Sequence, residues 1–590
     1  MLGTTSLLAG VIRCAPLSTT KSDLLRNGMP LLVRAAEHAR MGRILAHDKY
    51  IACDEESKQQ DASPSHEGRK ISYSYHEILS ASTHLHKYFK QIREQTSANN
   101  PPQRIAFLCT PGPQYISCQF ACWSSGSIAV PLCISHRSSE LAYVLKDCDP
   151  SLVIDGTNPA TSELQIAAKE VGLLDRYHGI DDLMLGFDFG ANNDDYALGS
   201  NGDINSIDSP ALLVYTSGTT GNPKGVVHTH RNIYHQVTDL VTSWGWCKDD
   251  AILHFLPLHH VHGIINKLAC CIWAGGSVEF VKFHPVKIWE RLAEASRRRE
   301  IKSCNNSNNK TDEHEPKEPT VFMAVPTVYG KMLEVAESGL LGNIDEKQSC
   351  SNLRLMVSGS AALPTKIHQR WKALTNHTIL ERYGMTEFGM ALSNPLAPVE
   401  KRLPGFVGLP LPSVEVKVVS EETGETIPKQ TAQSGELCVR GPTVFQEYWQ
   451  KENATRESFD AEGFFKTGDV AEYDPAVDSY RILGRLSADI IKSSGFKLSA
   501  LEIERELLEH PDLAEVVVLG IPDDIKGESV GLICRMSSRA ARVIDLDELR
   551  AWCRDRIASY KIPSAMLVME TIPKNAMGKV NKKQLVHLFQ

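Results

Sequence analysis

A short segment that begins at Ala211 restricts the fold and chemistry of this chain most. It runs from the apolar stretch ALLVY through the loop TSGTTGNPKG to a second stretch, VVHTH. Small residues let backbone N–H groups and hydroxyls approach an anion closely, and a lysine adds positive charge. The segment therefore predicts a strand followed by a polyphosphate-binding loop made of Thr216, Ser217, Gly218, Thr219, Thr220, Gly221 and Lys224.

This loop differs from the Walker A loop of ordinary P-loop ATPases. A Walker A loop requires GxxxxGK[ST], whereas Lys224 stands between Pro223 and Gly225. A flexible Gly/Ser/Thr linker is the other interpretation, but the strand before the loop and the ordered pattern after it favour a binding loop.

Length, charge and cysteine content restrict the class of protein. The 590 residues exceed what one hydrophobic core usually supports, so at least two domains are expected. The formal net charge of -8 argues against nucleic-acid binding through a broad basic surface, so small molecules fit better as partners. The 15 cysteines include no CxxC pair, which favours reduced thiols and an intracellular compartment. Four histidines and Lys267 interrupt the long apolar stretch from Ala251 to Trp273, so no transmembrane segment is expected.

Strands that alternate with helices predict an α/β fold of layered sheets. ALLVY, TVFMAV (320–325) and LRLMVSG (353–359) are typical of strands, and PTKIHQRWKALTN is typical of a helix. The polar stretches from Asp54 to Gly68 and from Ser303 to Pro319 are expected to be surface loops.

The pattern changes from about Asp489. The amphipathic helix KLSALEIERELLEH, with Ser499 as its cap, precedes the strand AEVVVLGI and a second helix around LDELRAWCRDRI. We therefore expect a large N-terminal domain of layered sheets with flanking helices at residues 29–484 and a small α+β domain at residues 485–590.

The first residues resemble an organellar transit peptide. They carry Arg13, Lys21 and Arg26, are rich in Ser, Thr and Leu, and contain no acidic residue before Asp23. We expect residues 1–28 to direct the protein to the mitochondrial matrix. A frayed terminus on a cytoplasmic protein is the alternative.

Several motifs together resemble the adenylate-forming superfamily, which includes acyl-CoA synthetases, luciferases and the adenylation domains of peptide synthetases. The resemblance begins with YTSGTTGNPKG and continues through RYGMTE (382–387), FFKTGD (464–469), ILGR (482–485), IIKSSGFKLSALEIE (490–504) and PKNAMGKVNKKQL (573–585). These motifs extend, in this order, over nearly the whole chain after its N-terminal extension. The resemblance implies an enzyme that uses ATP to activate a carboxylic acid as its acyl-AMP.

The resemblance assigns the residues of the nucleotide site. It implies that Lys579 bridges the substrate carboxylate and the α-phosphate, while Lys224 contributes charge at the phosphates. Tyr383, with Gly384 and Thr386 beside it, would contact the nucleotide, and Glu387 would hold Mg²⁺, a hard cation that takes oxygen ligands. Asp469 would accept hydrogen bonds from the ribose, with Arg485 nearby.

The second half-reaction is assigned to coenzyme A. In the resembled family the small C-terminal domain rotates after adenylation and admits the thiol. Gly495 and Lys497 are expected to bind coenzyme A. The stretch GRLSADIIK is one residue longer than the family spacing, so the hinge is either Ser487 or Asp489.

The acid is expected to be a short dicarboxylate. LPLHHVHG, AVPTVYGKML, LMVSGSAALP and LERYGMTEFGMALSNPL resemble the malonyl-CoA synthetases, including the organellar kind. A second carboxylate requires a cation, because burying it unpaired is costly. Lys331 is the candidate, helped by Ser358 and Ser360, with His260, Val261 and Met385 at the pocket wall. The histidines of LPLHHVHG match no zinc spacing, and Lys331 as a helix-surface lysine remains an equal interpretation.

Other functions remain open at this stage. Methylmalonate, acetate or a medium-chain fatty acid could replace malonate, and a non-catalytic nucleotide-binding protein could share the fold. A peptide-synthetase unit would need a carrier domain, and a luciferase-type oxygenase would consume oxygen with its acyl-AMP.

Overall fold

The computed structural model describes residues 30–40, 43–48, 72–95, 103–157, 162–185, 187, 206–216, 222–304, 317–494, 496–537, 540, 542–574 and 580–589. The predicted transit peptide, the stretch from Asp54 to Gly68, loop residues 217–221, Gly495 and Lys579 lie outside these ranges.

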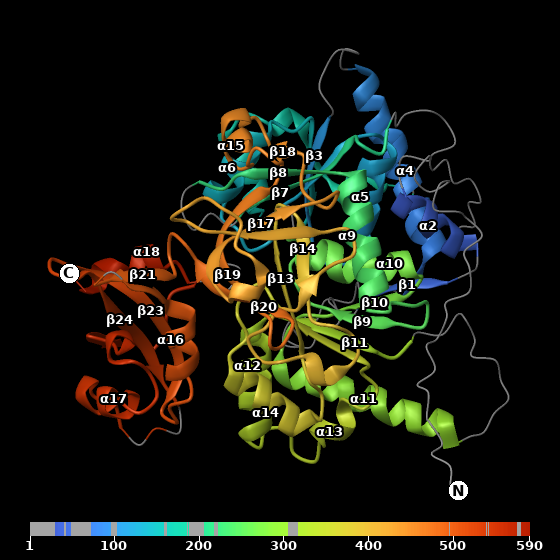
Figure 1. Ribbon diagram of the computed structural model, residues 1–590. Helices are drawn as coiled ribbons and strands as arrows, with labels where there is room; N and C mark the ends of the chain where they lie inside the picture. The colour runs from blue at the N-terminus through green and yellow to red at the C-terminus, as the bar shows by residue number, and fades with distance from the viewer. Residues whose placement is uncertain are drawn as a thin grey trace, which may run out of the picture.

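Two large sheets form the body of the molecule (Figure 1). The first has the order β18 (Glu447–Tyr448), β8 (Gly225–Thr229), β7 (Pro210–Tyr215), β4 (Ile128–Pro131), β3 (Arg104–Cys109), β5 (Leu152–Gly156) and β6 (Tyr177–Gly179). The second has the order β15 (Leu409–Pro410), β14 (Gly389–Ser393), β13 (Leu380–Met385), β12 (Leu355–Ser358), β11 (Val321–Ala324), β9 (Ala251–His254), β10 (Ser277–Phe280), β1 (Ile44–Asp48) and β2 (Ser72–Ser74).

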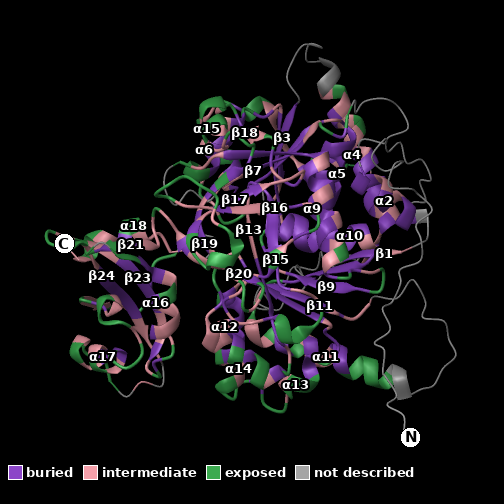
Figure 2. Cartoon of the chain, viewed as in Figure 1, coloured by how far each residue is buried: buried purple, intermediate pink, exposed green. Residues whose placement is uncertain are grey.

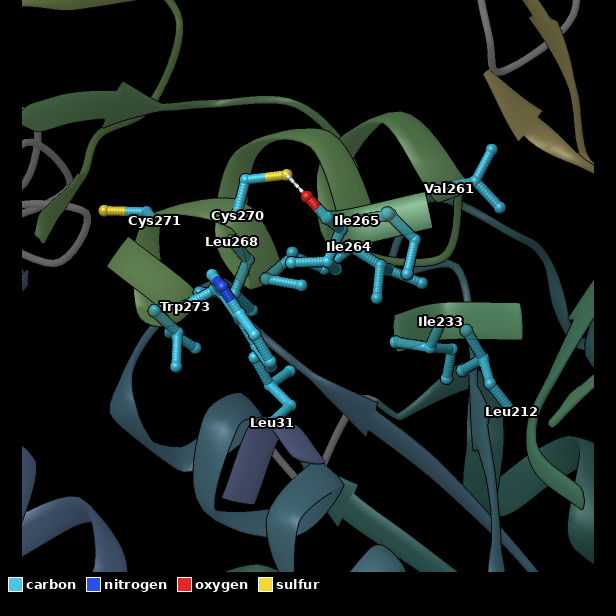
Figure 3. Close-up of a cluster of buried hydrophobic side chains, with 14 of the residues drawn as sticks. Leu31, Leu212, Ile233, Val261, Ile264, Ile265, Leu268, Cys270, Cys271 and Trp273 are labelled. Carbon is cyan, nitrogen blue, oxygen red and sulfur yellow. Dashed lines mark hydrogen bonds between the residues drawn. The ribbon is translucent and has the colours of Figure 1, made fainter. Parts of the chain in front are cut away.

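Helices between and outside these sheets bury both faces of their strands. The inner helices are α2 (Pro30–Arg40), α4 (Tyr75–Gln95), α5 (Pro113–Ser124), α9 (His230–Ser243), the π-helix η3 (His262–Ala269) and α10 (Cys270–Ala274). Figure 3 shows this core, in which Leu212 of β7 and Ile233 of α9 lie near the side chains of η3. Parallel strands buried on both faces require such continuous apolar runs.

The outer faces of the two sheets have their own helices. α6 (Ser138–Cys148) and α7 (Glu163–Glu170) cover the first sheet, with η2 (Leu174–Arg176) next to α7, whereas α8 (Ile180–Leu183) packs into the inner core. α11 (Pro285–Cys304), α12 (Pro326–Glu337), α13 (Glu346–Ser349) and α14 (Thr365–Thr375) cover the second. Buried residues therefore fill the middle of the body, and exposed ones lie on its outer helices (Figure 2).

A third sheet contains the later motifs FFKTGD and ILGR. It is antiparallel, with the order β16 (Glu415–Val419), β17 (Ser434–Arg440), β19 (Phe465–Asp474) and β20 (Ser479–Arg485). Short elements join it: η4 (Val399–Lys401), η5 (Lys429–Thr431) and α15 (Glu452–Glu457).

The C-terminal module stands beside this sheet and α12 (Figure 1). Its strands are β22 (Phe496–Ser499), β21 (Ile490–Ser493), β24 (Gly527–Met536), β23 (Leu513–Asp523) and β25 (Ala565–Val568). Its helical segments are α16 (Ala500–Leu507), α17 (Leu546–Cys553), η6 (Ser559–Lys561), α18 (Lys582–Leu585) and η7 (Val586–Phe589). Side chains of α16 and α17 pack on one face of the sheet.

The predicted α/β architecture is confirmed. β7, β11, β12, α14 and β23 occupy the expected segments, and Ser499 caps α16 by accepting a hydrogen bond from the Glu502 N–H. The start predicted for the surface loop, Ser303, is too early, because helix α11 continues to Cys304. Within the described ranges, no helix has the length and apolar content that a membrane span requires.

Candidate active site

The predicted phosphate loop is held closed at its base. β7 and β8 pair antiparallel, with Tyr215 opposite Gly225. The Thr216 N–H donates to the Lys224 carbonyl at 2.9 Å, and the Lys224 N–H donates to Thr216 Oγ1 at 3.1 Å. Thr216 and Lys224, on either side of the predicted loop, are therefore held together at the end of β7.

The nucleotide residues assigned from separate motifs meet at one carboxylate. The Tyr383 hydroxyl of β13 donates to Asp469 Oδ2 at 2.7 Å, and Arg485 Nε of β20 donates to Asp469 Oδ1 at 2.8 Å. Burial, with the neighbouring Asp469, raises the pKa of Tyr383, so this phenol stays protonated and acts as a donor.

Glu387 lies just beyond β13 and is only 6% exposed. Its Oε1 accepts a hydrogen bond from the Tyr448 hydroxyl at 2.8 Å. The Lys224 ammonium lies 4.6 Å from the centroid of the same tyrosine ring. Burial raises the pKa of Glu387, and the Tyr448 hydrogen bond opposes that shift. Tyr448 thus joins the phosphate-loop lysine to the predicted magnesium ligand, a role that sequence reasoning missed.

Gly384 and Thr386 shape the turn between β13 and β14. A Cβ added at Gly384 would lie 2.0 Å from the Gly389 carbonyl oxygen, so only glycine allows this close approach. The Thr386 carbonyl accepts a hydrogen bond from His228 Nε2 of β8 at 2.7 Å, which ties the two large sheets together.

A single cleft collects these side chains. It has a volume of about 1730 Å³ and is lined on the large-domain side by Thr216, Lys224, Tyr383, Gly384, Thr386, Glu387, Asp469 and Arg485. The C-terminal module lines the opposite side with Glu504, Arg505, Lys574 and Val580. Lys574 and Val580 are the described residues on either side of residues 575–579, and both line this cleft.

The residues predicted for the acid are divided between the cleft and the core. Lys331, Ser358, Ser360 and Met385 line the cleft, with Lys331 exposed on α12. Val261 is buried in the main hydrophobic core, next to η3 (Figure 3). His260 is partly buried beside it, with its ring centroid 3.9 Å from that of His259. Neither His260 nor Val261 is among the residues that line the cleft.

Sequence reasoning also missed Arg382, a buried cation at the cleft. Arg382 is 4% exposed, and its Nη2 donates weakly to Ser360 Oγ at 3.5 Å. Its Nε has no hydrogen-bond partner among the described residues, and neither has Ser358 Oγ. Burial lowers the pKa of Arg382 to about 9, which leaves the guanidinium charged at neutral pH. Buried polar groups are nearly always hydrogen-bonded, so the Arg382 Nε and the Ser358 hydroxyl are donors that an anionic group in the cleft can use.

A backbone feature explains how Arg382 fits. A Cβ added at Gly359 would lie 2.5 Å from the Arg382 Cζ, so the guanidinium lies directly against the glycine backbone. His262, at the start of η3, approaches Ser360 Oγ with its Nδ1 at 3.3 Å. Burial and the nearby Arg382 lower the pKa of His262, which is therefore a neutral imidazole. The cleft is thus lined by a guanidinium and two hydroxyls, with the His262 imidazole next to one of these hydroxyls.

The two hinge candidates lie between β20 and β21, and Lys497 lies on β22, while Gly495 is outside the described residues. Asp489 Oδ2 accepts a hydrogen bond from the Arg485 N–H at 2.9 Å, whereas Ser487 is exposed. Lys497 pairs with Glu421 of the large domain at 3.0 Å.

The chain belongs to the AMP-binding enzyme family. Residues 54–449 match the AMP-binding enzyme family, and residues 502–579 match the C-terminal domain of AMP-binding enzymes. The resemblance drawn from the motifs is therefore confirmed.

Similar proteins include ligases named for malonate. The mitochondrial malonate–CoA ligase ACSF3 of Xenopus laevis is 42% identical over 88% of this chain and 88% of its own length. The malonate–CoA ligase of Arabidopsis thaliana is 40% identical over 87% of this chain and 84% of its own length. The crystal structure of ATP-bound MatB from Rhodopseudomonas palustris is 28% identical, with a TM-score of 0.73, over 88% of this chain and 95% of that one.

Proposed function

We propose that this protein is an ATP-dependent acid–CoA ligase that converts malonate, ATP and coenzyme A into malonyl-CoA, AMP and pyrophosphate. The observation that carries the choice of acid is Arg382, a buried guanidinium that faces the cleft without a hydrogen-bond partner at its Nε among the described residues. The only carboxylate of a monocarboxylic acid is the one that reacts at phosphorus. Malonate has a second carboxylate, which does not react and needs such a cation. The similarity to malonate–CoA ligases supports the same choice.

The first half-reaction forms a mixed anhydride. A carboxylate oxygen of malonate attacks the α-phosphorus of ATP, and pyrophosphate leaves. Both reactants are anionic, so catalysis depends on positioning and charge neutralisation. Lys224, with the loop of Ser217, Gly218, Thr219, Thr220 and Gly221, would hold the phosphates, while Lys579 would bridge the two reacting groups. Tyr383 and Asp469 would hold the adenosine.

The second half-reaction transfers the acyl group. The sulfur of coenzyme A attacks the malonyl carbonyl carbon, the thiol proton is lost, and AMP leaves with the bridging oxygen. We propose that a mobile domain, residues 485–590, turns against the body, residues 29–484, to bring Gly495 and Lys497 to the cleft. Asp489 is the proposed hinge, because its carboxylate already holds the Arg485 N–H.

Glu387 fits a magnesium ion. It is a buried carboxylate at the cleft, close to Lys224, and Mg²⁺ is commonly held by one or two carboxylates together with substrate phosphates. The ion would neutralise phosphate charge when bound. Tyr448 would keep the Glu387 carboxylate ionised and fixed in position.

The Tyr448→Phe variant is expected to shift the pH dependence of the enzyme upward. Burial raises the Glu387 pKa, and the Tyr448 hydrogen bond favours the charged form. Loss of that bond raises the pKa further, so the acid limb of kcat/KM should move up by about 0.5–1 pH unit. Profiles measured with saturating Mg²⁺ check this. Tyr473→Phe, which removes a surface bond to Asp478, is the control. An unmoved limb would show that Glu387 does not set it.

Lys331 is proposed to assist at the entrance to the acid pocket. It is exposed on α12 and lines the cleft, so its contribution is screened by solvent. We expect Lys331→Ala to raise the KM for malonate about fivefold and to change the KM for propionate less than about twofold. The control is Lys372→Ala, an exposed lysine on the neighbouring helix α14. Equal changes for both acids would remove Lys331 from a role in specificity.

The proposed activity is tested by AMP formation with malonate, methylmalonate, acetate and octanoate, with and without coenzyme A. Malonate should give the highest kcat/KM, and AMP release should depend on coenzyme A. Preference for another acid would support the broader assignment, a ligase for short- or medium-chain acids. ATP binding without any acid-dependent turnover would indicate a non-catalytic nucleotide-binding protein.

The proposed location is the mitochondrial matrix. Residues 1–28 have the composition of a transit peptide, and the Xenopus relative is named as mitochondrial. Imaging of the full chain fused to a fluorescent protein, compared with a chain that starts at residue 29, tests this location. A cytoplasmic signal from the full chain would contradict it.

A further inference from the structure

Lys582 forms a partly buried ionic contact with two acidic residues. Its Nζ lies 2.6 Å from Asp489 Oδ1 and 2.8 Å from Glu504 Oε1, and its side chain is 11% exposed. Burial alone would lower the pKa of the Lys582 ammonium, but the two carboxylates outweigh burial and raise it. A cation that bridges two carboxylates away from water holds them in fixed positions.

Asp489 connects this contact to the domain junction. β20 of the large domain ends at Arg485, and β21 of the C-terminal module begins at Ile490. The Asp489 N–H donates to the Arg485 carbonyl at 2.7 Å, and its own carbonyl accepts from the Ala500 N–H at 2.7 Å. Arg485 in turn holds Asp469 in the nucleotide site. Continuous contacts therefore run from the nucleotide site through Asp489 to Lys582.

In this orientation of the C-terminal module, the described residues on either side of 575–579 line the cleft. Lys574 and Val580, on either side of this segment, line the cleft together with Lys582. Phe496 and Lys497 of β22 are not among the residues that line the cleft, and the Phe496 ring stacks on that of Tyr560 with centroids 4.6 Å apart. This orientation suits adenylation, because the residues that flank Lys579 in the sequence line the cleft and those of β22 do not.

We propose that Lys582 is a positioning residue that holds Asp489 in the adenylation conformation of the hinge. Lys582 and Glu504 both belong to the C-terminal module and move together. Asp489 stands at the junction, so the contact between Lys582 and Asp489 is the one that rotation disrupts. The contact therefore biases the two domain orientations without touching a substrate. This inference rests on the proposed two-step reaction.

The Lys582→Met variant separates the half-reactions. We expect malonate-dependent ATP–pyrophosphate exchange to fall about 30-fold, while malonyl-CoA formation from supplied malonyl-AMP changes less than about threefold. Lys582→Arg should restore most of the exchange. Asp489→Asn combined with Lys582→Met should be no worse than the more impaired single variant, because both changes remove one contact. Lys561→Met, which removes a 2.6 Å ion pair with Glu502 in the same module, is the matched control.

Hydrogen–deuterium exchange tests the hinge without any acid substrate. With ATP alone, amides in residues 486–504 of Lys582→Met should exchange about tenfold faster than in the wild type, and Lys561→Met should match the wild type. Equal loss of both half-reactions, or hinge exchange equal to that of the wild type, would overturn the proposal. A wild type that lacks malonate-dependent exchange would refute the malonate assignment instead, and the hinge measurement would still decide the role of Lys582.

Discussion

Lys579→Ala should lower malonate-dependent ATP–pyrophosphate exchange by about 10²–10³-fold and leave thioester formation from malonyl-AMP within about threefold of the wild type. Attack of a carboxylate on the α-phosphorus brings two negative groups together, and a mobile lysine would neutralise them only during this step. Lys574 and Val580, which stand on either side of residues 575–579 in the sequence, both line the cleft.

The two half-reactions are measured separately to distinguish this role from a loss of folding. Lys526→Ala, an exposed lysine of the same module, is the control for both assays. If Lys579→Ala impairs both half-reactions alike, the assignment of Lys579 to adenylation is wrong.

Arg382→Met should lower kcat/KM for malonate about 100-fold and lower kcat/KM for propionate less than about fivefold. Removal of the guanidinium leaves the second carboxylate of malonate buried without a cation, whereas propionate carries no such charge. Arg382→Lys should retain part of the malonate activity, because an ammonium keeps the charge but not the planar geometry.

Thermal unfolding of the Arg382 variants is the control for stability. Arg382 is buried against the backbone of Gly359, so the melting temperature and the activity with propionate show whether the fold is intact. A folded Arg382→Met variant that loses activity equally with both acids would exclude Arg382 from recognition of the second carboxylate.

Local sequence patterns were sufficient to predict much of the fold. The strand before Thr216 and the helix capped by Ser499 are local signals, and the structure places both as expected. The grouping of Tyr383, Asp469 and Arg485 followed from the family resemblance, because only tertiary structure joins three separate strands.

The residues that were missed depend on long-range packing. Tyr448 lies on the two-residue strand β18, and its bond to Glu387 spans 61 residues of sequence. Arg382 is buried because Gly359 lacks a side chain, which no local pattern indicates. The spacing around the hinge could not separate Ser487 from Asp489, whereas the contact with Lys582, far along the chain, favours Asp489.

Oxygen-18 transfer from malonate to AMP tests the central claim most directly. Attack of a carboxylate oxygen on the α-phosphorus, followed by transfer of the acyl group to sulfur, leaves that oxygen on AMP. With malonate labelled in its carboxylates, mass spectrometry should find one oxygen-18 atom in each AMP formed and none in pyrophosphate. Unlabelled AMP, or label in pyrophosphate or inorganic phosphate, would contradict the formation of malonyl-AMP in this cleft.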